Sequence, residues 1–427
     1  MTQNFTQGLI FGGQVQFDPS NMSAFGTLET AELTPVMQGD FVYGTNTQIW
    51  STANYTGTGA LVDTNASRLR IQCGTSATSY AYITTRRIIR YRAGEGTVIR
   101  LTPLFSSGTA NNIQLWGIGS ISNNLPQEGY YFGYNGTSFG IAHYNRGTGT
   151  WTAQNSWNGD RCLSGDGSFV FNPTLGTPAM IKYPYLGYGN IEFFLQNPDT
   201  ARWVLAHVIK YANTSPVTQL ANPSLQILGY TANSGNTTNR TMYCGSYAAF
   251  ISGMRSFIGN PKWAADSAGL VTPGTGIKVV GTTETCLLNL RNCTTYNGNP
   301  NRGMLRINSI SVGNGSVGNN IIIRLLIGAT FTTTPVYTPI NGSTVDNGAT
   351  ITGGNSIASV DVAGTTITSL ANRGSFIFNV SVGANGSQII DLTPFEIYVA
   401  PGEILTVSGQ GTAGTNTTAS LNWTEDI

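Results

Sequence analysis

Turn-forming dipeptides interrupt this chain at short intervals, and their spacing constrains the fold more than any other feature. The Asn-Gly and Asp-Gly pairs include those that begin at Asp166, Asn297, Asn341, Asn347 and Asn385. Such pairs favour the tight turns of β-hairpins. The segments between turn signals are short and have the period of a strand. In residues 373–383, for example, large apolar side chains alternate with Asn379 and Ser381, so one face of a strand is apolar and the other polar.

The composition favours the same structural class. Charged residues make up 10% of the 427 residues and the net charge is +1, whereas 53 residues are Gly. Disordered chains combine low hydrophobicity with high charge, and nucleic-acid binding usually needs a basic excess. Both classes are therefore disfavoured, as is a fold of long helices, because Gly, Asn, Thr and Ser are poor or mediocre helix formers. We predict an all-β protein with two β-sandwich or jelly-roll domains in tandem.

A change in composition near residues 262–282 suggests where these domains meet. Pro, Gly and small residues gather there, and six of the seven Trp precede residue 265. We predict an N-terminal arm or attachment segment (1–40), a lectin-like β-sandwich (41–262), a linker (263–282) and a C-terminal jelly roll (283–427). The last segment has a suitable length for one eight-stranded sandwich.

Features of export and of membrane insertion are not recognisable. No window approaches 18 consecutive apolar residues, and the first residues combine no basic segment with an apolar core, so we expect neither a membrane span nor a cleavable signal. The five cysteines are odd in number and widely scattered, which favours reduced thiols over a disulfide framework. We expect a chain that folds in cytosol.

Residues suited to catalysis are sparse. The two histidines, His143 and His207, have no nearby Cys, Asp or Glu at the spacing of a nucleophile or metal site. His207 alternates with apolar residues and is expected to point toward the core, whereas His143 precedes a turn and is expected to be exposed. Cys286 and Cys293 lack the further ligands of a zinc site. We therefore predict no catalytic residues, metal or cofactor, and a protein that is not an enzyme.

Arginine is the one charged residue that is concentrated. Seven of the 17 Arg fall within one short stretch, at Arg68, Arg70, Arg86, Arg87, Arg90, Arg92 and Arg100. Arg is favoured where planar, bidentate or stacking contacts matter. One interpretation is an interface or anionic-ligand patch made by Arg86, Arg87, Arg90 and Arg92. Replacing Arg87 and Arg90 with Ala would then weaken assembly without disturbing the fold.

The other interpretation of these arginines is structural. They would pack across strands beside the rings of Tyr80, Tyr82 and Tyr91, with cation–π support. The sequence does not decide between the two.

Three long blocks of the sequence resemble a known group of proteins. They are residues 83–105 (ITTRRIIRYRAGEGTVIRLTPLF), residues 129–147 (GYYFGYNGTSFGIAHYNRG) and a C-terminal block made of 286–302 and 390–427. Together they resemble virion structural proteins, of the capsid-decoration, fibre and tail kind, of tailed phages and large double-stranded DNA viruses. The resemblance spans about 60–427. It implies a structural role and assigns no site residues.

Together, these observations predict a non-enzymatic protein of the virion surface that is assembled in the host cytoplasm. It would decorate the capsid, form a fibre or spike, or belong to the tail. Its expected partners are other copies of itself in a trimer, other virion proteins and host-surface glycans, with no nucleic acid and no membrane insertion. Exposed Asn, Thr and Tyr could contact sugar hydroxyls, although the sequence does not indicate where.

The sequence also allows two alternatives. A carbohydrate-active enzyme on a concanavalin-like sandwich would need two carboxylates on one face, and Glu128 and Glu192 are the candidates. A cell-surface adhesin would need an export signal.

Overall fold

The computed structural model describes residues 33–252, 260–267, 277–362, 366–367, 370–412 and 414–427. The chain divides into two compact units. The N-terminal unit comprises Met1–Thr85 and Tyr91–Arg255, and the C-terminal unit comprises Arg86–Arg90 and Ser256–Ile427. The short segment Arg86–Arg90 therefore belongs to the C-terminal unit, although the residues on both sides of it belong to the other.

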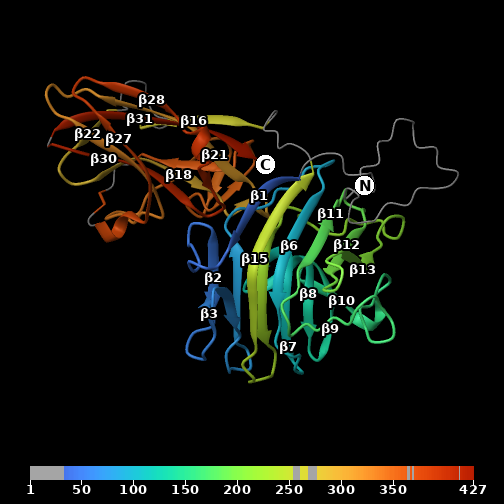
Figure 1. Cartoon of the computed structure of the whole chain (residues 1–427). Coiled ribbons are helices and arrows are strands. Elements are labelled where there is room, and N and C mark those ends of the chain that lie inside the picture. The colour runs from blue at the N-terminus through green and yellow to red at the C-terminus, as the bar shows by residue number, and fades with distance from the viewer. Residues whose placement is uncertain (1–32, 253–259, 268–276, 363–365, 368–369, 413) are drawn as a thin grey trace, which may run out of the picture. The chain divides into compact units, whose positions relative to one another are not determined.

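An eight-stranded antiparallel sheet forms one layer of the N-terminal unit within the described residues (Figure 1). Its order is β13-β12-β11-β6-β15-β4-β3, and β1 also pairs with β15. The strands are β1 (Leu33–Asp40), β3 (Leu61–Asn65), β4 (Arg68–Gln72), β6 (Thr97–Leu104), β11 (Ala179–Tyr183), β12 (Ile191–Gln196), β13 (Trp203–Ile209) and β15 (Thr241–Ser252).

A seven-stranded antiparallel sheet forms the second layer in the described part of this unit, with the order β10-β9-β8-β7-β14-β5-β2. The strands are β2 (Trp50–Asn54), β5 (Tyr80–Thr85), β7 (Asn112–Ser122), β8 (Leu125–Asn135), β9 (Ser138–Asn145), β10 (Thr148–Ala153) and β14 (Gln226–Asn233). A short 3₁₀ helix, η2 (Gln154–Ser156), follows β10. Strands β7 to β10 are successive hairpins joined by two-residue turns at 123–124, 136–137 and 146–147, a connection length that is common in β-hairpins.

Aromatic side chains hold the two layers of this sandwich together. Tyr130 and Phe132 of β8 contact Tyr183 and Phe193 of the eight-stranded sheet, with ring centroids 5.6 and 5.2 Å apart. Because successive strand residues point to opposite faces, Tyr131 between them points away from this core.

The C-terminal unit consists of two six-stranded sheets and one four-stranded sheet in its described part. The first six-stranded sheet contains β16 (Lys262–Asp266), β17 (Lys278–Val280), β21 (Met304–Asn314), β28 (Ser387–Asp391), β29 (Tyr398–Val399) and β31 (Thr415–Asp426). The second contains β18 (Thr285–Asn292), β22 (Ile321–Ile327), β23 (Thr338–Pro339), β26 (Ala358–Asp361), β27 (Ser375–Val382) and β30 (Ile404–Gly411). The four-stranded sheet contains β19 (Thr295–Tyr296), β20 (Asn299–Pro300), β24 (Ser343–Val345) and β25 (Thr350–Thr352). The 3₁₀ helices η3 (Leu370–Arg373) and η4 (Thr393–Phe395) complete the elements.

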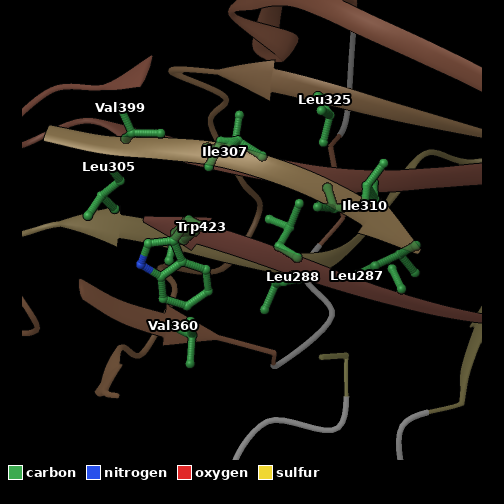
Figure 2. Close-up of a cluster of buried hydrophobic side chains, with 14 of the residues drawn as sticks. Leu287, Leu288, Leu305, Ile307, Ile310, Leu325, Val360, Val399 and Trp423 are labelled. Carbon is green, nitrogen blue, oxygen red and sulfur yellow. The ribbon is translucent and has the colours of Figure 1, made fainter. Parts of the chain in front are cut away.

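The core of the C-terminal unit lies between its six-stranded sheets. Leu305 and Ile307 of β21 and Trp423 of β31 come from one sheet, and Leu288 and Val360 come from the other (Figure 2). All five side chains are buried, and burial of such side chains is the main stabilising contribution to folding. The predicted all-β class with sandwich units is confirmed.

The structure differs from the expected boundaries at two described places. Strand β1 lies within the predicted arm, yet it pairs with β15, whereas residues 1–32 of that arm lie outside the described residues. Strands β16 and β17 lie in or beside the predicted linker, yet both pair with β31. Strand β31 has 12 residues, so its free side offers backbone hydrogen bonds to both short strands.

Among the described residues, no helix is long and apolar enough to cross a membrane. All five cysteines are free and buried, which confirms the prediction of free thiols. Burial raises the pKa of each thiol, for example that of Cys73, so these side chains stay protonated and act as small apolar groups.

Candidate functional site

The face of the seven-stranded sheet that points away from the sandwich core carries an aromatic cluster. Its buried centre consists of Leu115, Tyr131, Ala142, Leu228 and Tyr230. Partly buried side chains surround this centre: Tyr80, Tyr82, Ile113, Ile121, Tyr144, Trp151 and Ala232. The strand register places them on one face, because Trp151 pairs with Ala142, Ala142 with Tyr131, and Tyr230 with both Leu115 and Tyr82. We call this set the aromatic face.

Glycine lets two of these rings lie close over the backbone. A Cβ atom at Gly119 would lie 1.7 Å from the hydroxyl oxygen of Tyr131, and a Cβ atom at Gly149 would lie 2.8 Å from Cζ of Tyr144. Both distances are too short for any other residue without displacement of the ring. The Tyr131 hydroxyl also donates a hydrogen bond to the carbonyl of Glu128, with an O–O distance of 2.8 Å. The rings are thereby fixed in place before any ligand binds.

A pocket lies at the end of the aromatic face formed by β7 to β10. It is lined by Ile113, Leu115, Tyr134, Asn135, Ala142, Tyr144, Gly149, Thr150 and Trp151. The Trp151 ring is oriented by a 3.4 Å hydrogen bond from its Nε1 to the hydroxyl of Ser138. Most of the lining is apolar or aromatic, and Asn135 and Tyr144 carry polar side-chain atoms on this face. The pocket is a shallow hollow, and its apolar walls and few polar groups can contact a ligand that lies across it.

The aromatic face is electrically neutral. Burial raises the pKa of the Tyr144 and Tyr82 phenols, so these hydroxyls stay protonated at neutral pH. A protonated phenol both donates and accepts hydrogen bonds. The face can therefore stack against an apolar ligand surface and hydrogen-bond the hydroxyl groups at its edge.

The two candidate carboxylates, Glu128 and Glu192, are not brought together on one face. Glu128 lies on β8, on the same side as Tyr130, and its carboxylate accepts the backbone N–H groups of Arg146 and Ala221, both at 3.2 Å. Glu192 lies on β12 of the other sheet and alternates with Phe193, which contacts β8. Burial raises the pKa of Glu192, and the nearby Lys182 lowers it in part.

The two histidines are part of the packing between loops and strands. His207 is buried, as predicted, and its Nδ1 accepts the backbone N–H of Asn158. The prediction of an exposed His143 is wrong, because its imidazole stacks on Tyr130 at 5.0 Å and its Nε2 lies 3.0 Å from the Gln219 carbonyl. Burial lowers the pKa of both imidazoles. Within the described residues, no three His, Cys, Asp or Glu side chains gather in a group that could hold a metal.

Two arginines of the predicted patch form ion pairs inside the C-terminal unit. Arg86 pairs with Glu403, and Nη1 of Arg90 lies 2.6 Å from Oδ1 of Asp426. The side chain of Asp426 is 1% exposed. These partners are more than 300 residues away in sequence, so no local signal could have identified them.

The other two arginines of the patch have different surroundings. The Arg87 guanidinium lies over the ring of Tyr398, 4.6 Å from the centroid, and is 3.7 Å from the Glu396 carboxylate. Arg92 belongs to the N-terminal unit and lies 3.9 Å from Glu95. The role of the four arginines in a subunit interface or in anion binding stays a prediction.

Ring contacts also occur at two arginines outside the patch. The guanidinium of Arg68 lies over Tyr243, and that of Arg100 lies within 6 Å of the rings of Trp203 and Phe250. These rings differ from the tyrosines named in the structural interpretation.

The aromatic face was not predicted from the sequence, although the sequence contains a signal for it. Gly, Ala and aromatic residues alternate at a period of two through the hairpins, as in Gly140, Ala142 and Tyr144. This pattern places small residues and rings on the same face of the sheet.

The chain was compared with family models, curated proteins and solved structures, and only solved structures are similar to it. No family model matches the chain, and no curated protein matches it. One similar solved structure is the carbohydrate recognition domain of Emp46p (TM-score 0.32, 9% identity), covering 51% of this chain and 96% of that chain. A second is the exoplasmic/lumenal domain of VIP36 in a Ca²⁺/Man3GlcNAc-bound form (TM-score 0.33, 10% identity), covering 53% of this chain and 92% of that chain. A third is an immunostimulatory antigen and pseudo β-1,3-glucanase of Mycobacterium tuberculosis (TM-score 0.34, 12% identity), covering 51% of this chain and 99% of that chain. The fold assignment rests on the strand pairing described above.

Proposed function

We propose that this chain is a non-enzymatic structural protein of a virus surface, and that its N-terminal unit binds glycans on the aromatic face. The observation that carries the glycan-binding part is the pocket beside Tyr144 and Trp151. The C–H face of a sugar ring stacks on aromatic rings, and its hydroxyls hydrogen-bond amide and hydroxyl side chains. The pocket supplies both kinds of contact.

The surroundings of Glu128 support a binding role over hydrolysis. Its side chain is 6% exposed and accepts two backbone N–H groups. It also points toward the sandwich core, away from the pocket. Glycoside hydrolysis needs two carboxyl groups on opposite sides of the scissile bond, about 5 to 9.5 Å apart, and the aromatic face presents neither Glu128 nor Glu192 in that way.

The virion role is supported by the sequence resemblance and by the low charge of the chain. The C-terminal unit also exposes apolar side chains on edge strands: Phe376 on β27 is 47% exposed and Ile389 on β28 is 81% exposed. Strand β27 contains no charged residue, although charge is a common means of protecting an edge. We propose that copies of the chain assemble as trimers and contact other virion proteins.

A glycan-binding screen tests the central part of this proposal. Wild-type protein is applied to immobilised oligosaccharides beside Trp151→Ala, which removes one wall of the pocket. Tyr43→Ala is the matched control, because Tyr43 is a fully exposed aromatic outside the aromatic face. Loss of one stacking ring should weaken binding about tenfold, and Tyr43→Ala should bind like wild type. Wild-type protein that binds no saccharide, or a Trp151→Ala variant that binds equally well, would contradict the proposal.

A further inference from the structure

The seven-stranded sheet is almost free of charge. Glu128 is the only Asp, Glu, Lys or Arg in its seven strands, all of which the structure describes. The eight-stranded sheet of the same unit differs, because its strands contain seven such residues: Asp40, Asp63, Arg68, Arg70, Arg100, Lys182 and Glu192. The lack of charge is therefore a property of this sheet and not only of the chain as a whole.

The one charge in this sheet does not reach the aromatic face. Glu128 is on the side of Tyr130, and two backbone N–H groups occupy its carboxylate. Among the three turns that join β7 to β10, the only Lys or Arg is Arg146, at the β9–β10 turn. Arg146 is exposed and does not line the pocket.

A charged sugar would therefore lose hydration on this face without gaining an ionic partner. Burial of an ionised carboxylate or sulfate is strongly unfavourable unless a cation or several hydrogen-bond donors replace the water. An uncharged sugar avoids this cost. Its apolar face can stack on Trp151, and its hydroxyls can pair with the side chains of Asn135 and Tyr144, which line the same pocket.

We infer that the aromatic face selects uncharged saccharides and disfavours carboxylated, phosphorylated and sulfated ones. This inference rests on the proposed glycan-binding function and names the ligand class of the same pocket. Because stacking and neutral hydrogen bonds provide the affinity, binding should depend little on ionic strength, whereas ionic recognition is weakened by salt.

A paired panel of ligands tests the inference on the full chain. The probes are N-acetyllactosamine, mannotriose and maltohexaose, each beside a sialylated, phosphorylated or sulfated form, at low and high salt. We expect at least one uncharged probe to bind about tenfold or more tightly than its charged form at both salt concentrations. Trp151→Ala should lose this binding. Arg146→Ala should retain it.

The outcomes separate the two proposals. Tighter binding of the charged forms, or equal binding of both forms, would overturn the inference. The contradiction would be most direct if Arg146→Ala or high salt abolished the binding of the charged forms. The proposed function would survive that result if Trp151 were still required. Failure of every probe to bind would contradict the glycan-binding function itself.

Discussion

Single side chains in the N-terminal unit are held in their uncharged state by burial. His143 is the clearest example, because it lies between the ring of Tyr130 and the carbonyl of Gln219. Burial disfavours the imidazolium ion, which lowers the pKa of His143 below its ordinary value. The folded state therefore binds a proton at His143 less tightly than the unfolded state does.

Acidification should therefore destabilise the N-terminal unit. At pH values between the lowered pKa of the folded state and the unfolded value near 6.5, the unfolded chain binds a proton that the folded chain does not. The free energy of unfolding therefore falls as the pH falls. One such imidazole contributes up to about 1.4 kcal/mol per pH unit. His143→Gln should reduce this pH dependence, measured by urea unfolding at a series of pH values below about 7. An unchanged slope in the variant would show that His143 does not titrate in this way.

Among the elements, the segment Arg86–Arg90 is the least predictable from sequence. It follows β5 directly, yet it packs in the C-terminal unit, where Ile88 contacts the buried side chains of Met304 and Ala400. The partners of its arginines are equally distant in the chain. This packing changes the expectation that Ala at Arg87 and Arg90 would leave the fold undisturbed.

The Arg90 ion pair should stabilise the C-terminal unit. Arg90→Ala leaves the buried carboxylate of Asp426 without its guanidinium partner, which should cost about 2 kcal/mol. Arg161→Ala is the matched control, because the Arg161–Asp166 pair has the same 2.6 Å distance but side chains that are 46% and 58% exposed. Exposed pairs contribute about 0.5 kcal/mol. Hydrogen exchange measures each effect in the unit that holds the pair, at the β31 amides for Arg90→Ala and at the β13 amides for Arg161→Ala. Equal effects of both variants would refute a stabilising role for the buried pair.

The parts of the fold that local sequence encodes were predictable. Alternation indicates strands, and the Asn297-Gly298 and Asn347-Gly348 pairs lie between strands that pair with each other, because both signals act over a few residues. The Asn385-Gly386 pair instead joins β27 to β28, which lie in different sheets. The sheet order was not predictable, since β6 pairs with β11 and β15 and β7 pairs with β14, and these contacts depend on the packing of distant segments. The pocket was not predicted because its lining comes from four successive strands, and the register of these strands decides that Ile113 of β7 and Trp151 of β10 line the same site.

At the scale of the whole molecule, assembly and location follow from the proposed virion role. Purified virus particles should contain this chain, and density assigned to it should have three-fold symmetry. Mass spectrometry of particles and solution mass measurements provide the two tests. A chain that is absent from particles and is a stable monomer in solution would contradict the assignment.

The central claim is that a saccharide binds on the aromatic face. A crystal structure of the full chain with the tightest-binding uncharged oligosaccharide tests it most directly. We predict a sugar ring stacked on Trp151 or Tyr144, with its hydroxyls near Asn135. A sugar bound to any other surface, with the pocket beside Trp151 left open, would contradict it.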